Sequence, residues 1–149
     1  MSDDRRIAGL LEALYAAERG HLLLRVPEIA AYADRHEAVH LRTVRQMARE
    51  AREHLDWLAE AAEACGAGLP PAPAQAGSGH LHYLDLRTLL PRLIESTSRL
   101  LQRYRACADL TAGGDHRVDE VLTRIAGRHQ VHLDTLTGIQ AQLEAACPS

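Results

Sequence analysis

The chain contains no lysine and no phenylalanine, and it has few cysteines and few aromatic residues. Its 17 basic residues are all arginine, and they do not gather in a basic run or tail. The cluster of basic residues that is typical of nucleic-acid-binding proteins is therefore missing, and we expect no nucleic-acid partner. Three widely spaced cysteines, Cys65, Cys107 and Cys147, form no C-x-x-C pair, which argues against a disulfide framework and fits a reducing compartment.

Long apolar runs and a targeting segment are also missing. No apolar stretch approaches the ~18 residues that a membrane-spanning helix needs, and the first residues, MSDDRR, are polar and acidic. We therefore expect a cytoplasmic protein without a membrane partner. A chain of 149 residues suits a single domain over 1–149.

Leucine and alanine, which are strong helix formers, supply most of the apolar residues, whereas the β-branched and aromatic residues that favour strands are scarce. No segment alternates between apolar and polar residues with a period of two. The composition therefore predicts an all-α protein. We expect helices at about 3–33, 35–65, 85–112 and 115–146, and a linker at 66–84.

The segment at 35–65 carries the clearest helical pattern. Its apolar residues recur at alternating steps of three and four, which keeps them on one narrow stripe, as at the seam of a bundle. That stripe consists of Leu41, Val44, Ala48, Ala51, Leu55, Leu58, Ala62 and Cys65. Asp34 followed by Glu37 predicts a capping box at the helix start. Gly66 predicts the helix end, because glycine accepts the left-handed conformation that often closes a helix.

The first helix contains a proline, Pro27, which removes a backbone hydrogen bond and clashes with the preceding turn. Either the helix ends near Arg25, or it bends at the proline and continues to a tight turn at Asp34. We favour the bend, because Asp34 then caps the second helix and the first two helices come out about equal in length.

The segment at 66–84 is rich in Pro, Gly, Ser and Ala, which is the composition of a linker. Its length favours a crossing over the bundle rather than a hairpin. The other two connections are short. Four long helices joined in this way predict an antiparallel four-helix bundle with a long crossover between the second and third helices.

The helix at 115–146 carries the strongest chemical signal. Its inward stripe is aliphatic except at the two middle positions, His129 and His132. If the first helix turns into the second at about residue 34, then Glu18, His21 and His54 lie at the same level of the bundle.

Imidazoles and a carboxylate buried among leucines are costly unless they pair with one another or bind a cation. Both E-x-x-H at 18–21 and H-x-x-H at 129–132 place two side chains one turn apart on one helix face, a spacing that suits a shared metal. The predicted metal ligands are Glu18, His21, His54, His129 and His132. The alternative is a metal-free cluster in which neutral histidines hydrogen-bond to the carboxylate. No catalytic residue is assigned.

Three stretches carry a resemblance to a known family: A-A-E-R-G-H at 16–21, R-E-H-L-D-W-L at 52–58 and R-H-Q-V-H-L-D-T-L at 128–136. They resemble, in turn, the first-helix motif around the first Glu ligand, the end of the second helix, and the fourth-helix E-x-x-H of the ferritin-like superfamily. That superfamily includes bacterioferritins, rubrerythrins and Dps-type proteins. The resemblance implies a bundle that holds a transition metal ion, iron first and zinc as the alternative. It also implies a role in metal or oxidative stress, with at most a metal-dependent oxidase activity.

The chain departs from the family pattern at several ligand positions. Ala51 stands where a second-helix Glu is expected, with Glu50 one residue away, and His129 replaces the fourth-helix Glu. Glu95 occupies the place of the third-helix Glu, but its helical phase points it away from the stripe at 86–104. These departures favour a histidine-rich mononuclear site, or a site that has been lost, over a carboxylate-bridged di-iron centre.

Two other metal motifs compete with this interpretation. The stretch at 36–40, H-E-A-V-H, matches the H-E-x-x-H zinc motif of metalloproteases. A match this short arises easily by chance in a chain with nine histidines, and Glu37 is already employed in the predicted cap. A hemerythrin-like sensor would need H-x-x-x-E and H-x-x-x-H sets, of which only the pair His36 and His40 offers one. We favour neither.

The alternative from a different class is a metal-free bundle that serves as a scaffold or interaction module. It predicts that the isolated protein carries no stoichiometric metal. Under either interpretation we expect a homo-oligomer, with a dimer as the first choice. Tyr15, Tyr32 and Trp57 lie off the helix stripes and could form a dimer surface, although a single exposed aromatic residue is unremarkable.

Overall fold

Helices account for nearly all of the described chain. The computed structural model describes residues 2–28, 35–67, 69, 85–111, 114 and 116–146. The elements in chain order are the α-helix α1 (Ser2–Arg19), the 3₁₀-helix η1 (Leu22–Glu28), and the α-helices α2 (Ala38–Ala64), α3 (Leu86–Thr111) and α4 (His116–Ala145). The all-α prediction is confirmed.

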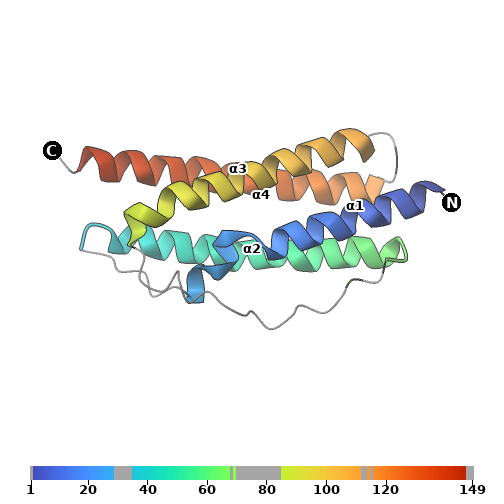
Figure 1. Ribbon diagram of the computed structural model, residues 1–149, viewed down its shortest axis with the longest axis horizontal. Helices are drawn as coiled ribbons and strands as arrows, with labels where there is room; N and C mark the ends of the chain where they lie inside the picture. Colours follow the sequence, from blue (N-terminus) through green and yellow to red (C-terminus); the bar gives the residue numbers. More distant parts are fainter. Residues whose placement is uncertain are drawn as a thin grey trace.

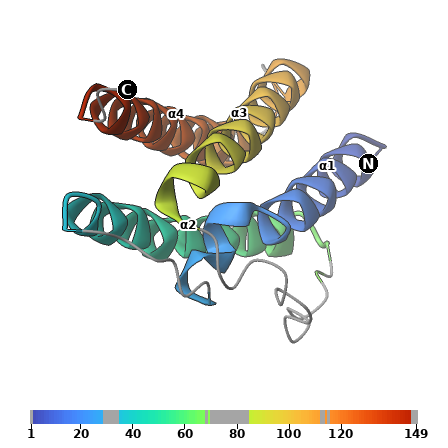
Figure 2. The same cartoon turned by 60° about the vertical axis from the view of Figure 1, so that its left-hand side comes forward.

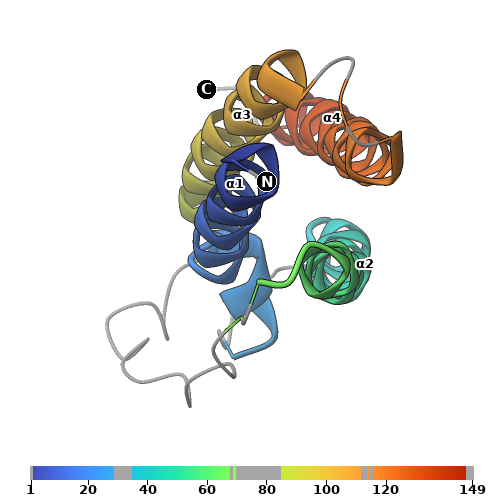
Figure 3. The ribbon, with the colours of Figure 1, turned by 90° about the vertical axis from the view of Figure 1, so that its right-hand side faces the viewer.

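The four α-helices form an antiparallel bundle with α1 and α4 at opposite corners, so that each of these two packs against both α2 and α3 (Figures 1 and 3). α2 and α3 run in the same direction, so α2 ends at the far end of the bundle from the start of α3 (Figure 1). The chain between them must therefore return along the length of the bundle, which confirms the predicted crossover. The linker at 70–84 itself lies outside the described residues.

The end of α1 differs from the prediction of a helix that bends at Pro27 and continues to about residue 33. α1 ends at Arg19, and Pro27 lies inside η1, which packs against α2 (Figure 2). Gly20 is a poor helix former, and Pro27 disfavours the α conformation at the residue before it. The chain therefore changes to the tighter 3₁₀ winding before the proline is reached. Residues 29–34 lie outside the described chain.

The start of α2 also differs from the predicted capping box. Asp34 lies outside the described residues, and Glu37 occupies the N-cap position without a side-chain hydrogen bond to the helix backbone. The Glu37 carboxylate instead accepts a hydrogen bond from Arg87 Nε at 2.9 Å, so it ties the start of α2 to α3.

The predicted end of α2 is confirmed. Gly66 has φ +77°, the left-handed conformation that glycine adopts without strain. Its N–H donates to the Glu63 carbonyl at 3.0 Å, and the Ala67 N–H donates to the Ala62 carbonyl at 2.8 Å. This pair of hydrogen bonds is a Schellman motif.

α3 begins at Leu86 because the Asp85 carboxylate accepts a hydrogen bond from the Thr88 N–H at 2.7 Å. Pro91 lies inside the helix and does not delay its start. α4 begins at His116.

The core is divided in two along the bundle. One apolar cluster includes Leu11, Leu14 and Ile125, and the other includes Leu93, Leu136 and Ile139. Each fully buried leucine contributes about 1.5–3 kcal/mol to folding. Between the two clusters lies a layer of buried polar side chains. Its members are Glu18, His21, His54, Thr97, His129 and His132.

The predicted inward stripe of α4 is buried at all eight positions: Val118, Leu122, Ile125, His129, His132, Leu136, Ile139 and Leu143. Over the described residues, no helix combines the length and the apolar character needed to cross a membrane.

Candidate metal centre

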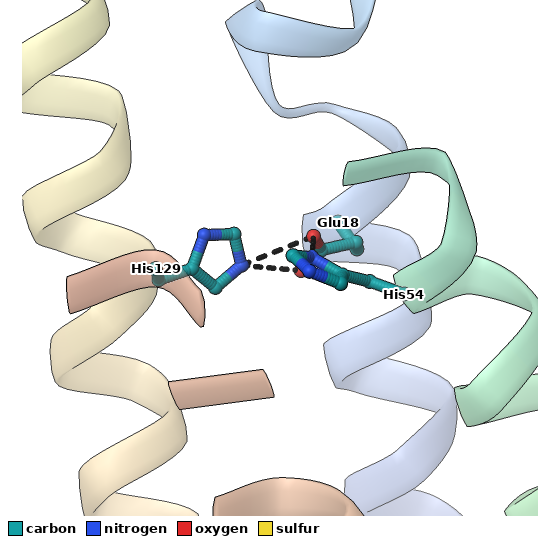
Figure 4. Close-up of side chains that lie close together, drawn as sticks. All are labelled: Glu18, His54 and His129. Carbon is teal, nitrogen blue, oxygen red and sulfur yellow. Dashed lines mark hydrogen bonds and ion pairs between the residues drawn. The ribbon is translucent and has the colours of Figure 1, made fainter. Parts of the chain in front are cut away.

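Glu18 is the centre of the polar layer. It lies in the last turn of α1, and both its side chain and that of His54, on α2, are fully buried. His54 Nδ1 lies 2.8 Å from Glu18 Oε1, and His129 Nε2, from α4, lies 3.1 Å from each carboxylate oxygen (Figure 4). Three helices thus bring one carboxylate and two imidazoles into direct contact.

Tyr104, on α3, is a further partner of the carboxylate that the sequence analysis did not assign to the site. Its hydroxyl donates a hydrogen bond to Glu18 Oε2 at 2.7 Å, and its side chain is fully buried. The signal was present in the sequence, because Tyr104 is an aromatic residue with a polar tip on a stripe of leucines. A buried tyrosine hydroxyl usually has a hydrogen-bond partner.

The charges of the cluster follow from these contacts. Burial raises the pKa of Glu18, but the hydrogen bonds with His129 and His54 outweigh burial and hold that pKa below its ordinary value. Burial lowers the pKa of His54 against the opposing effect of Glu18, and burial raises the pKa of Tyr104. The centre is therefore an ionised carboxylate surrounded by three protein donors at pH 7.

His21 is placed differently from the prediction that E-x-x-H puts Glu18 and His21 on one helix face. α1 ends at Arg19, so His21 follows the helix instead of belonging to it. His21 Nδ1 lies 2.7 Å from Ser96 Oγ of α3. Its ring is edge-on to that of His129 at a centroid distance of 5.4 Å. His21 thus borders the Glu18 centre without a direct contact to the carboxylate.

His132 belongs to the same buried layer and bonds to a different carboxylate. Its Nε2 lies 3.0 Å from Oε2 of Glu50, whose side chain is 35% exposed. The rings of His132 and His129 are 6.3 Å apart. Glu50 is the residue next to the vacant family position at Ala51, and it reaches the edge of the layer rather than its centre.

The donor set at Glu18 fits a metal ion. One ligand atom each from Glu18, His54 and His129 can be chosen so that all lie within 4.8 Å of one another. Metal ligation requires the ring nitrogens that face Glu18 to give up their protons. The opposite nitrogens, His54 Nε2 and His129 Nδ1, can take up these protons, since neither has a hydrogen-bond partner among the described residues.

The geometry does not support the zinc-protease motif at 36–40 or the hemerythrin-like pair of His36 and His40. α2 begins at Ala38, so His36 precedes the helix and does not share a helix face with His40. Glu37 is bonded to Arg87. Glu95 is exposed and pairs with Arg99, which confirms that it points away from the α3 stripe.

Comparisons with known proteins identify the fold. No family model matches the chain, and no curated protein matches it. A solved structure of an N-terminal deletion mutant of Dps from Mycobacterium smegmatis aligns with 99% of this chain and 100% of its own, with a TM-score of 0.74 and 16% identity. The fold is ferritin-like. In this ferritin-like bundle the Glu18 centre lies at mid-length, between the two apolar clusters.

Proposed function

We propose that this ferritin-like chain binds a transition metal ion in the middle of its bundle, at Glu18, His54 and His129. The observation that carries the proposal is the convergence of these three buried side chains from three helices, with ligand atoms within 4.8 Å of one another. One carboxylate and two imidazoles suit iron or zinc better than magnesium or calcium. The structural likeness to a Dps favours iron.

His21 and His132 stay in the proposed site as neighbouring ligands. Each keeps one ring nitrogen, Nε2 in His21 and Nδ1 in His132, without a hydrogen-bond partner in the described part of the chain. Burial lowers the pKa of His21 to about 3 and also lowers the pKa of His132. Both rings are therefore neutral at pH 7, as metal ligation requires.

Iron, when bound, supplies one-electron redox chemistry, so any enzymatic role is limited to a metal-dependent oxidase in metal or oxidative stress. The chain itself supplies an anionic carboxylate and the imidazoles of His54 and His129. It also supplies a surrounding of fully buried leucines, including Leu14 and Leu93, which keep bulk water from the centre.

The alternative is a metal-free bundle that acts as a scaffold or interaction module. It is favoured by the three protein donors that already surround Glu18, because hydrogen bonds from His54, Tyr104 and His129 neutralise much of the cost of burying the carboxylate.

Elemental analysis of the untagged protein distinguishes the two. We expect about one metal ion per chain, lost in His129→Ala and retained in the matched control His116→Ala, which removes an exposed histidine of the same helix. Absence of metal from the wild type, even after exposure to Fe, Zn and Cu, would establish the metal-free bundle instead.

We also propose a cytoplasmic homo-oligomer, a dimer in the first place, without a nucleic-acid or membrane partner. Large apolar side chains on the surface support self-association: Val131 is 61% exposed and Leu110 is 56% exposed. Sedimentation velocity tests the assembly, since a monomer at all concentrations contradicts it.

A further inference from the structure

A surface groove of about 620 Å³ lies between α1 and α3, which lie side by side (Figure 3). Its α1 side is made of small residues, among them Ala13, Ala16 and Gly20. Small side chains leave the space open, but they do not by themselves identify a ligand. The residues on the α3 side and at the deep end of the groove indicate which kind of ligand fits.

The α3 side of the groove is basic. Arg92, Arg99 and Arg103 recur at steps of seven and four, so all three lie on the helix face that borders the groove. Arg99 pairs with Glu95. Arg92 and Arg103 make no hydrogen bond or ion pair with the residues that the structure describes, which leaves two guanidinium groups for an anion. The fork of a guanidinium matches the oxygens of a carboxylate or a phosphate.

His21 lies at the deep end of the groove, with only 2% of the residue exposed. Ser96 Oγ accepts a hydrogen bond from the Leu22 N–H at 3.3 Å and lies 2.7 Å from His21 Nδ1. His21 Nε2 has no hydrogen-bond partner within the described chain, and a buried polar atom without a partner is costly.

The shape of the groove restricts the ligand further. Its volume falls within the range of small-molecule sites. At 1.5 Å per residue, Arg92 and Arg103 lie about 16 Å apart along α3, which suits a ligand with more than one charged group. The described lining contains no Tyr or Trp on which a nucleobase would stack.

We propose that the groove between α1 and α3 binds a small polyanion with carboxylate or phosphate groups, held by Arg92 and Arg103. The proposal goes beyond metal binding and does not depend on it. An occupant that reaches His21 lies next to His129, whose ring is 5.4 Å from that of His21, and so borders the Glu18 centre.

Isothermal titration calorimetry of the metal-free protein at physiological salt tests this site, with tripolyphosphate and citrate as separate probes. We expect saturable binding of at least one probe. Arg92→Gln/Arg103→Gln should weaken it about tenfold or more, the loss of ~1.4 kcal/mol expected when charged hydrogen bonds are removed. Ala16→Gln, which narrows the groove without changing its charge, should also weaken it.

The matched control is Arg5→Gln/Arg42→Gln, which removes the same charge from two exposed positions outside the groove. Its affinity should stay within about twofold of the wild type. Binding of neither probe, or an equal loss in the control, overturns the proposal. The probe that binds more tightly identifies phosphate or carboxylate as the preferred group. Metal content of the groove variant, measured in parallel, tests the metal proposal separately.

Discussion

Two carboxylate–histidine contacts lie one turn apart along α4, in different surroundings. His129 Nε2 lies 3.1 Å from Glu18, and both side chains are fully buried. His132 Nε2 lies 3.0 Å from Glu50, whose side chain is 35% exposed. Chemical groups and distances are nearly the same in the two contacts, whereas the exposure of the carboxylate is not.

The difference teaches that the distance alone does not measure what a contact contributes. Water solvates Glu50 and screens its charge, so its contact with His132 contributes little. Glu18 is fully buried, so bulk water cannot replace its protein donors, and its ionised state depends on all of them together. The four predictions below test this contrast, beginning with the largest effect.

Neutralising the two carboxylates should separate the contacts most clearly. Glu18→Gln keeps the size of the side chain but replaces one accepting oxygen by an NH₂ group among three buried donors, so the free energy of unfolding should fall by about 3–5 kcal/mol. Glu50→Gln should cost at most about 1 kcal/mol. Urea denaturation of both metal-free variants provides the measurement. Equal losses would remove the distinction between the two contacts.

Acid should destabilise the metal-free protein through its buried histidines. The pKa of His21 is lowered to about 3 by burial, so between pH 6.5 and 3 the unfolded state binds a proton that the folded state does not. Stability must therefore fall as the pH falls, by ~1.4 kcal/mol per pH unit for each such group, or about 2 kcal/mol from His21 between pH 6.5 and 5. The lowered pKa of His54 acts in the same direction.

Urea denaturation at several pH values between 7 and 5 measures this slope. His21→Asn should flatten it, while the exposed His116→Asn should leave it unchanged. A stability that stays constant or rises on acidification contradicts neutral, buried histidines.

Tyr104→Phe should have an intermediate effect, because it removes one of the three donors to Glu18 and keeps the ring in place. Loss of a hydrogen bond to a charged, buried carboxylate costs about 1.5 kcal/mol or slightly more. Thermal unfolding of the metal-free variant measures it. An unchanged stability would show that Glu18 does not depend on this donor.

Glu95→Ala should have the smallest effect. Glu95 is 61% exposed in its side chain and pairs only with exposed Arg99 among the described residues, so stability should change by at most ~0.5 kcal/mol. The metal content should not change either, which elemental analysis of the same preparation checks. Loss of metal in this variant would show that α3 supplies a ligand, against the observed phase of the helix.

Periodicity predicted the bundle because helical winding is a local property. The eight-residue stripe of α4 needed only the steps of three and four, and the end of α2 needed only Gly66. The predicted end of the first helix was wrong, for a reason that is also present in the sequence. Gly20 and Pro27 together end α1 at Arg19. The prediction relied instead on the first two helices having about equal length.

The site was predicted less completely than the fold. Glu18, His54 and His129 do meet, as expected from their common level in the bundle. The partners Tyr104 and Ser96 were not assigned to the site. Both lie on α3, and because a long linker precedes α3, the sequence does not determine how α3 is aligned along α1.

The sequence by itself determined the helices, the faces that they bury and the level at which the polar residues gather, since these depend on neighbours within a few turns. Tertiary structure alone decided which histidine bonds to which carboxylate. A hydrogen bond tolerates only a few tenths of an ångström, whereas one turn of helix rises 5.4 Å. Small rotations and shifts between packed helices therefore join His129 to Glu18 and His132 to Glu50, and the break after α1 turns His21 toward Ser96.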